Sequence, residues 1–234
     1  MMNDKKGFTL TEILLAVMIV GLVGVALAAL TTAASRESGV GRSKVMMRNN
    51  LSLALRTLRN DINNATFIDE AKGPISGSAS GMGTVTLLKI KKNATTDGEI
   101  VQSSKFKSTT DKSTQALNQE YVTYCFIPGT TTSNVDGVAV LPAGATIGGR
   151  IYRASSTSPD PSCGSGSRLL LDNVKYIPSG NSYPVPLFCA GLACAFNSGS
   201  ESASLLSVRI ITELNSSPVT NDVIEEIFAV PNGF

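Results

Sequence analysis

The amino-acid sequence predicts an α+β protein in which one long N-terminal helix packs on an antiparallel β-sheet. Residues 13–30 form an apolar run without a charged side chain, and residues 51–62 continue with apolar residues at helical spacing. From residue 72, Gly, Ser and Thr separate short apolar runs, which is typical of strands and turns. One helix followed by several short strands favours a helix that covers one face of an antiparallel sheet.

The first apolar run is long enough to cross a membrane. Its 18 residues span about 27 Å as a helix, close to the thickness of the hydrocarbon layer. Lys5 and Lys6 precede the run, whereas the next charges after Glu12 are Arg36 and Glu37. Because basic residues stay on the cytoplasmic side, we expect a cytoplasmic N-terminus and export of the chain after the run.

The composition argues against several classes of function. The 234 residues suffice for one domain and a membrane segment. With 20 basic and 18 acidic residues the net charge is only +2, so no nucleic-acid partner is expected. The chain contains no histidine, which removes Ser-His and Cys-His catalytic pairs and His-ligated zinc. We therefore expect no enzymatic activity, no cofactor and no metal site.

All four cysteines, Cys125, Cys163, Cys189 and Cys194, lie in the part expected to be exported. An even number of cysteines in an exported domain favours disulfides, and four cysteines allow three connectivities. We expect Cys189 and Cys194 to close a small loop, which leaves Cys125 to pair with Cys163. Free buried thiols are the alternative. Zinc is disfavoured because no C-x-x-C pair is present.

Residues 5–12 read KKGFTLTE and lead directly into the apolar run. This string resembles the processing site of type IV pilins and type II secretion pseudopilins, which combines a basic leader, a glycine, a phenylalanine and a glutamate four positions later. The resemblance implies that a prepilin peptidase cuts between Gly7 and Phe8 and methylates the new amino group of Phe8. It is close only as far as about residue 30, and beyond that it implies the pilin-like architecture.

The resemblance divides the chain into four segments. These are the leader (1–7), the transmembrane or filament-core half of the helix (8–34), its amphipathic half (35–68) and the exported β-rich domain (69–234). Two other interpretations stay open: a secretory signal cleaved after the small-residue motif at 26–28, and an uncleaved anchor. The length of the apolar run and the carboxylate of Glu12 weigh against the secretory signal.

Glu12 places a carboxylate beside the apolar run, where an unpartnered charge costs on the order of 3 kcal/mol or more. Cleavage before Phe8 would create a partner, because the new α-ammonium of one subunit can neutralise Glu12 of its neighbour. This pairing would fix the axial register between adjacent subunits. The alternative is that Glu12 simply lies at the level of the lipid headgroups.

The second half of the helix is expected to be amphipathic and to end near residue 65. Its apolar face consists of Leu51, Leu55, Leu58 and Ile62. The other faces carry Arg48, Arg56, Arg59 and Asp61. Gly39 and Gly41 predict a bend or local break between the two halves.

Seven strands are expected after the helix, at residues 84–90, 120–127, 149–154, 168–176, 187–196, 204–212 and 223–230. Polar loops are expected at 73–83, 107–118, 129–136 and 155–167. Lys89, Lys91 and Lys92 are interpreted as a solvated strand edge rather than a nucleic-acid contact. The acids Asp172, Glu213, Asp222, Glu225 and Glu226 form no D-x-D-x-D-G loop, so calcium is not expected.

The expected function is that of a minor pilin or pseudopilin that nucleates or caps a type IV pilus or a type II secretion pseudopilus. The exported part is larger than many major pilins, and residues 58–65 resemble the PilW-like minor pilins and J-type pseudopilins. The implied partners are other pilin or pseudopilin subunits, the prepilin peptidase and the inner-membrane assembly platform. The implied location is the inner membrane before assembly, with the C-terminal domain periplasmic or extracellular, and the filament afterwards. The alternative is a signal-anchored adhesin or binding protein that does not polymerise.

Overall fold

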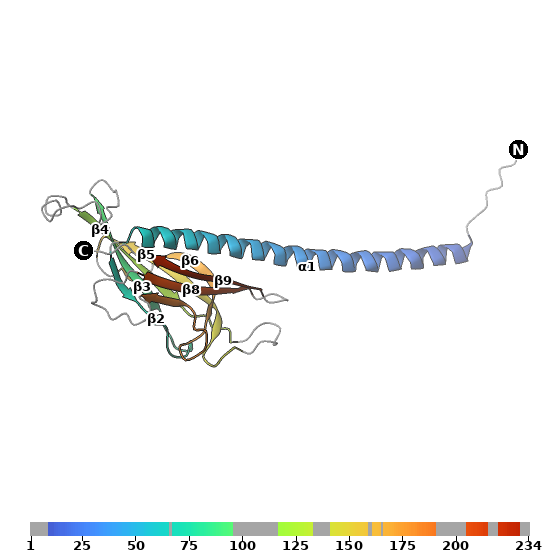
Figure 1. Ribbon diagram of the computed structural model, residues 1–234. Helices are drawn as coiled ribbons and strands as arrows, with labels where there is room; N and C mark the ends of the chain where they lie inside the picture. The colour runs from blue at the N-terminus through green and yellow to red at the C-terminus, as the bar shows by residue number, and fades with distance from the viewer. Residues whose placement is uncertain are drawn as a thin grey trace. The chain divides into compact units, whose positions relative to one another are not determined.

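The computed structural model describes residues 9–65, 67–95, 117–132, 141–158, 161–164, 166–190, 205–214 and 220–229 (Figure 1). These residues form one helix and an antiparallel sheet of nine strands. The chain divides into two compact units, Met1–Val45 and Met46–Phe234. A long apolar helix followed by an antiparallel sheet confirms the predicted α+β class.

Helix α1 (Leu10–Asn63) is a single element of 54 residues. The local break predicted at Gly39 and Gly41 does not occur, because both residues are helical. Ser43 donates its hydroxyl to the carbonyl oxygen of Gly39 at 3.0 Å, an additional side-chain bond within this part of the helix. Glycine costs a helix only about 1 kcal/mol relative to alanine, so two glycines alone do not interrupt it.

The helix ends at Asn63, earlier than the sequence pattern indicates. The amide of Ala65 donates to the carbonyl of Ile62 at 3.0 Å, a tightened last turn of the kind that often closes helices. Strand β1 (Phe67–Ala71) follows almost directly. The predicted helical segment 35–68 is therefore too long, since Phe67 and Ile68 belong to β1.

The strands that follow β1 are β2 (Gly73–Pro74), β3 (Val85–Thr95), β4 (Leu117–Ile127), β5 (Thr146–Ser156), β6 (Arg168–Tyr176), β7 (Leu187–Ala190), β8 (Leu205–Leu214) and β9 (Thr220–Ala229). The sheet runs β1-β3-β4-β5-β6-β8-β7-β2, and β9 pairs with β8 as a branch. Strands β3 to β9 correspond to the seven predicted strands, and β6 has the predicted bounds. β7 ends at Ala190, and the rest of its predicted range lies outside the described residues.

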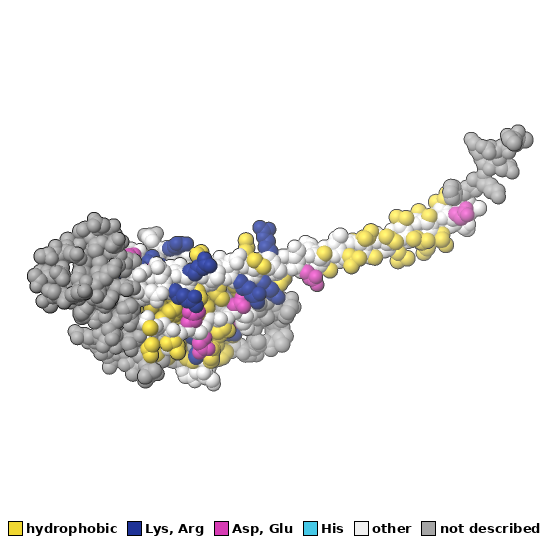
Figure 2. Space-filling model, turned by 45° about the horizontal axis from the view of Figure 1, so that its top comes forward, with side chains coloured by type: hydrophobic (Ala, Val, Ile, Leu, Met, Phe, Trp, Pro, Cys, Tyr) yellow, Lys and Arg dark blue, Asp and Glu magenta, His cyan; other side chains and the backbone are white. Residues whose placement is uncertain are grey.

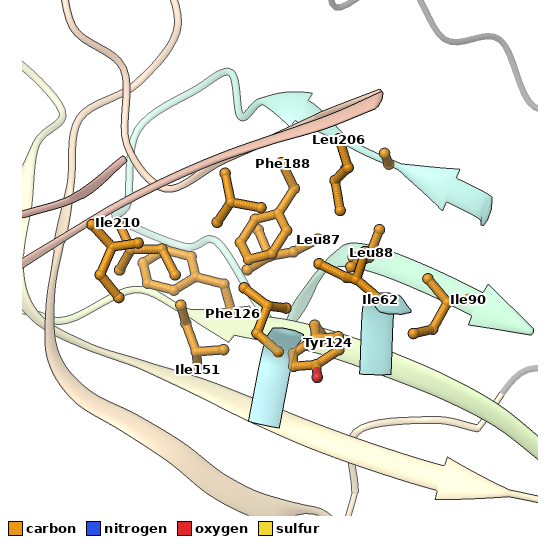
Figure 3. Close-up of a cluster of buried hydrophobic side chains, with 14 of the residues drawn as sticks. Ile62, Leu87, Leu88, Ile90, Tyr124, Phe126, Ile151, Phe188, Leu206 and Ile210 are labelled. Atoms are coloured by element: carbon orange, nitrogen blue, oxygen red, sulfur yellow. The ribbon is translucent and has the colours of Figure 1, made fainter. Parts of the chain in front are cut away.

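The larger of two hydrophobic clusters among the described residues lies between the sheet and the last turns of α1 (Figure 3). Leu58 and Ile62 enter it from the helix, and the largest fully buried side chains of the sheet include Tyr124, Phe126 and Phe188. Burying an aliphatic or aromatic side chain of this size contributes about 1.5–3 kcal/mol. The predicted apolar helix face is confirmed at Leu58 and Ile62, whereas Leu51 and Leu55 are only partly buried at its margin.

Asp61, which was predicted to lie outside the apolar face of the helix, is buried against the sheet. Asp61 is 2% exposed and accepts hydrogen bonds from three strands. Lys92 Nζ in β3 donates to Oδ1 at 2.5 Å, and Tyr124 OH in β4 donates to Oδ2 at 2.5 Å. Arg153 in β5 donates Nε to Oδ2 at 2.6 Å and Nη2 to Oδ1 at 3.1 Å. Both carboxylate oxygens are therefore satisfied, which makes burial of the charge tolerable.

The interpretation of the lysine cluster as a solvated strand edge is also wrong. β3 lies between β1 and β4, so it is an inner strand. Lys92 is 3% exposed and belongs to the Asp61 cluster. Lys89 pairs with Glu70 at 3.4 Å, and Lys91 lies 5.8 Å from the centre of the Tyr121 ring. The lysines thus serve packing and ion pairing within the sheet.

A disulfide joins Cys125 in β4 to Cys163, with their Cα atoms 6.1 Å apart. The expected pairing of these two cysteines is therefore present in the structure. Cys189 in β7 is buried and also disulfide-bonded. Cys194 lies outside the described residues, so the Cys189–Cys194 bridge stays a prediction.

Candidate assembly site

Thr9 and Glu12 form a reciprocal cap at the start of α1. The amide of Thr9 and its hydroxyl each donate to Glu12 Oε2 at 2.9 Å. In return the amide of Glu12 lies 3.4 Å from Thr9 Oγ1 and 3.1 Å from the Thr9 carbonyl oxygen, to which it donates. Thr9 occupies the N-cap and Glu12 the third helical position, so the pair is a capping box that satisfies amides otherwise without partners.

The capping box gives Glu12 a local role in starting its own helix, in addition to the predicted pairing between subunits. The T-x-x-E spacing of residues 9–12 was the available signal. The negative carboxylate also lies at the positive end of the helix dipole. Both bonds from Thr9 reach Oε2, and within the described residues no hydrogen bond reaches Oε1. Because Glu12 is exposed, this second oxygen is available to a group from another molecule.

The helix that follows Glu12 exposes its apolar side chains, and Figure 2 shows them along the face in view. Every large apolar side chain from Leu10 to Leu30 is at least 51% exposed, the value for Val23. An 18-residue window of α1 has a mean hydropathy of 3.0 and no buried residue, so this helix is long and apolar enough to span a membrane. Such a surface is unfavourable in water by about 1.5–3 kcal/mol per large side chain. It requires lipid or other helices around it.

Glu12 lies at one end of a shallow apolar groove on this helix. The groove is lined by Ile13, Ala16, Val17 and Val20 together with Glu12. Glu12, Ala16 and Val20 are spaced by four, so they share one helix face, and the small side chain of Ala16 makes the depression between the larger neighbours. A polar acceptor at the end of an apolar groove suits a partner that has an apolar body and a positive end.

Hydroxyl groups at the other end of the apolar run are satisfied within the helix. Thr31 Oγ1 donates to the carbonyl of Ala28 at 2.9 Å, and Thr32 Oγ1 donates to that of Ala29 at 2.8 Å. These bonds reduce the cost of placing threonine near an apolar phase. The capped Glu12 and the two threonines thus bracket the apolar run.

The structure places only some of the residues singled out by sequence. Gly7 and Phe8 lie outside the described residues, and Glu12 begins the exposed apolar helix. Among the residues that the structure describes, no group of three or more His, Cys, Asp or Glu side chains is arranged to hold a metal ion.

A long apolar N-terminal helix followed by an antiparallel sheet is the α+β arrangement of pilin-like proteins. Residues 2–28 match the family model described as the prokaryotic N-terminal methylation motif. The chain therefore carries the prepilin motif of type IV pilin-like proteins, and its apolar helix and motif together indicate a membrane anchor. Comparison with curated proteins and with solved structures gave no significant match.

Proposed function

We propose that this chain is a minor subunit of a type IV pilus or a type II secretion pseudopilus, and that it nucleates or caps filament assembly. The observation that carries the proposal is the capped, exposed Glu12 at the start of an unburied apolar helix inside the methylation motif. A filament of packed helices provides the apolar surroundings that this helix lacks by itself. The chain acts by assembly and catalyses no reaction.

Processing supplies the positive partner that Glu12 needs. In the proposed sequence the prepilin peptidase hydrolyses the Gly7–Phe8 bond and releases residues 1–7. It then transfers a methyl group from a sulfonium methyl donor to the α-amino group of Phe8, which leaves the donor as a thioether. The new ammonium precedes the N-cap Thr9, where the positive end of the helix dipole disfavours it. Pairing with a carboxylate of a neighbouring subunit removes this penalty. At about 4 Å and an effective dielectric constant of about 20, such a pair is worth roughly 4 kcal/mol before desolvation.

Oε1 of Glu12, which accepts no hydrogen bond from the residues that the structure describes, and the adjoining groove are suited to receive that ammonium. Oε2 holds the cap through Thr9, while Oε1 accepts the neighbour's amino group. Ile13, Ala16 and Val17 offer apolar contact to the neighbour's phenylalanine ring and helix. One carboxylate thereby starts its own helix and fixes the axial position of the next subunit.

The proposed topology has residues 1–7 in the cytoplasm and the sheet domain in the periplasm or outside the cell. Lys5 and Lys6 support this orientation. The Cys125–Cys163 disulfide supports an oxidising location for the sheet domain. The proposed partners are other pilin or pseudopilin subunits, the prepilin peptidase and the inner-membrane assembly platform.

Two substitutions separate the capping and pairing roles of Glu12. Glu12→Gln retains a side chain that can close a capping box but removes the charge. Thr9→Ala removes the hydroxyl's part of the cap, leaves the backbone amide that donates to Glu12 Oε2, and keeps the charge. We expect Glu12→Gln to leave leader removal intact and to lower incorporation into the assembly at least about tenfold, a loss of ~1.4 kcal/mol. Thr9→Ala should assemble far better than Glu12→Gln. Normal incorporation of Glu12→Gln, measured by co-isolation with partner subunits, would contradict the pairing role.

A further inference from the structure

β9 is a long and regular edge strand. It pairs with β8 over ten successive positions, from Leu205 opposite Ala229 to Leu214 opposite Thr220, without a bulge. Within the described part of the chain it pairs with no other strand. The edge strand β1, by contrast, has five residues and a register shift between Ile68 and Glu70. A straight edge with unpaired backbone groups is a template for the addition of another strand.

The charges that commonly protect an edge strand are neutralised in β9. Each acid has an arginine partner from α1 or β8. The pairs are Arg48–Asp222 at 3.3 Å, Arg209–Glu225 at 3.0 Å and Arg59–Glu226 at 3.1 Å. The strand contains neither lysine nor proline. Charge repulsion therefore does little to keep a neutral strand away.

The outward face of β9 is apolar on both sides of a polar cluster. Val223 is 53% exposed and Ile227 is 70% exposed. Between them Glu225 accepts a hydrogen bond from Tyr183 OH at 2.7 Å, and the Arg209 guanidinium lies 3.8 Å from the centre of the Tyr183 ring. Fixed tyrosine and arginine side chains flanked by aliphatic residues are typical of the centres of protein interfaces.

A groove of about 220 Å³ lies between α1 and β9. Its helix side is formed by Arg48, Leu51, Ser52 and Leu55, and its strand side by residues 222–224 of β9. Leu51 and Leu55 are only partly buried, so the apolar helix face is incompletely covered here. A side chain projecting from a strand added beside β9 would fill this groove.

We propose that the β9 edge, with the groove beside it, docks an extended segment of a different subunit of the assembly, which adds to the sheet as a further strand. This proposal rests on the proposed function, because it takes the partner to be a filament subunit. The segment has alternating apolar side chains and a neutral or basic centre. A second copy of β9 fits less well, since antiparallel self-pairing gathers the three acids of each strand, while each arginine is already engaged by one acid of its own chain.

Photocrosslinking in the full chain, expressed with its own assembly system in membranes, tests the proposal. The crosslinking amino acid replaces Ile227 in β9. As a control it replaces Leu169 in β6, an aliphatic strand residue that is 48% exposed. We expect at least about tenfold more product from position 227, joined to an extended segment of another subunit with the methylation motif. Equal yields at 227 and 169 would overturn the docking edge. Product with β9 of a second copy would overturn the assigned occupant.

A third crosslinking position, Val17 in the apolar part of α1, reports on the proposed function separately. Product at Val17 without product at Ile227 would overturn only the β9 edge. Loss of product with partner subunits at both positions would overturn the proposed function as well.

Substitution and hydrogen exchange give independent measurements. Val223→Lys places a charge at the groove and should lower co-isolation of the partner about tenfold, or ~1.4 kcal/mol, while Leu169→Lys should not. Hydrogen exchange is measured on the unaltered chain, so its result does not depend on whether a variant folds. We expect β9 amides to exchange at least about tenfold more slowly in the assembly than in the isolated protein. Unchanged exchange in β9 would overturn the proposal.

Discussion

Arg153 of β5 holds Asp61 of α1 through two hydrogen bonds, Nε to Oδ2 at 2.6 Å and Nη2 to Oδ1 at 3.1 Å. The two residues are 92 positions apart in the sequence, and Lys92 and Tyr124 complete the same cluster. Glu120 lies 3.7 Å from both basic groups, so two acids face two bases. Because every charge in this cluster has a partner of opposite sign, the cluster fixes the position of the helix end on the sheet.

Replacing Asp61 should strongly destabilise the sheet domain. Asp61→Asn leaves Lys92 and Arg153 without their buried counter-charge, which costs about 3–5 kcal/mol. All five tyrosines lie between residues 121 and 183 and the chain has no tryptophan. Near-ultraviolet circular dichroism during denaturant unfolding in detergent therefore reports on this domain. Asp69→Asn, at an exposed position of β1, is the matched control and should change the unfolding free energy by less than about 0.5 kcal/mol.

The same cluster predicts a loss of stability in acid. Burial raises the pKa of Asp61, but the hydrogen bonds from Arg153, Lys92 and Tyr124 outweigh it and hold the pKa below its ordinary value. A carboxyl group whose pKa is lowered by folding stabilises the protein above the pKa of the unfolded chain. That contribution should disappear as the pH falls from about 4 through the lower folded-state pKa. Asp61→Asn should lack this part of the pH dependence; an identical acid profile in both proteins would refute the assignment.

Gly149 should tolerate no side chain. A Cβ added there would lie 2.6 Å from Cε2 of Phe126 and 2.8 Å from the carbonyl oxygen of Val174. Because the carbonyl belongs to the neighbouring strand β6, it cannot move aside freely. Gly149→Ala should cost about 1–3 kcal/mol of unfolding free energy. Gly83→Ala, where an added Cβ meets nothing within 4 Å, should be close to neutral in the same titration.

Gly7 should control leader removal. Gly7→Ala should slow cleavage and leave a larger precursor on gel electrophoresis, while Gly24→Ala changes a glycine in the same motif match without altering the proposed cleavage site. We expect the precursor to be the major form of Gly7→Ala and a minor form of Gly24→Ala. Equal processing of the two variants would count against cleavage after Gly7.

Local patterns predicted the helix and seven of the nine strands, and they missed β1 and β2, the second of which lies in the predicted loop 73–83. Contacts between distant segments could not be predicted. The spacing of Leu58 and Ile62 indicated the buried helix face, and the bounds of β6 followed from its apolar run. The burial of Asp61 was missed because its three partners lie on β3, β4 and β5, and no local signal links them to the helix. The branching of β9 from β8 likewise depends on strand order.

The candidate site could be predicted because its residues lie next to one another in the sequence. Glu12 stood out as a carboxylate beside an apolar run, and residues 5–12 carried the processing motif. The capping box was equally local and only required Thr9 to be considered together with Glu12. The groove between α1 and β9 had no sequence signal, since it combines residues 48–55 with residues 222–224.

Mass spectrometry of the mature N-terminus, on protein isolated from its native membranes, tests the central claim most directly. The proposed ion pair with Glu12 exists only if processing creates an amino group at Phe8. The expected result is a chain that begins with N-methylated Phe8. A chain that keeps Met1 or Met2, or one that begins at Ala29, would contradict the account.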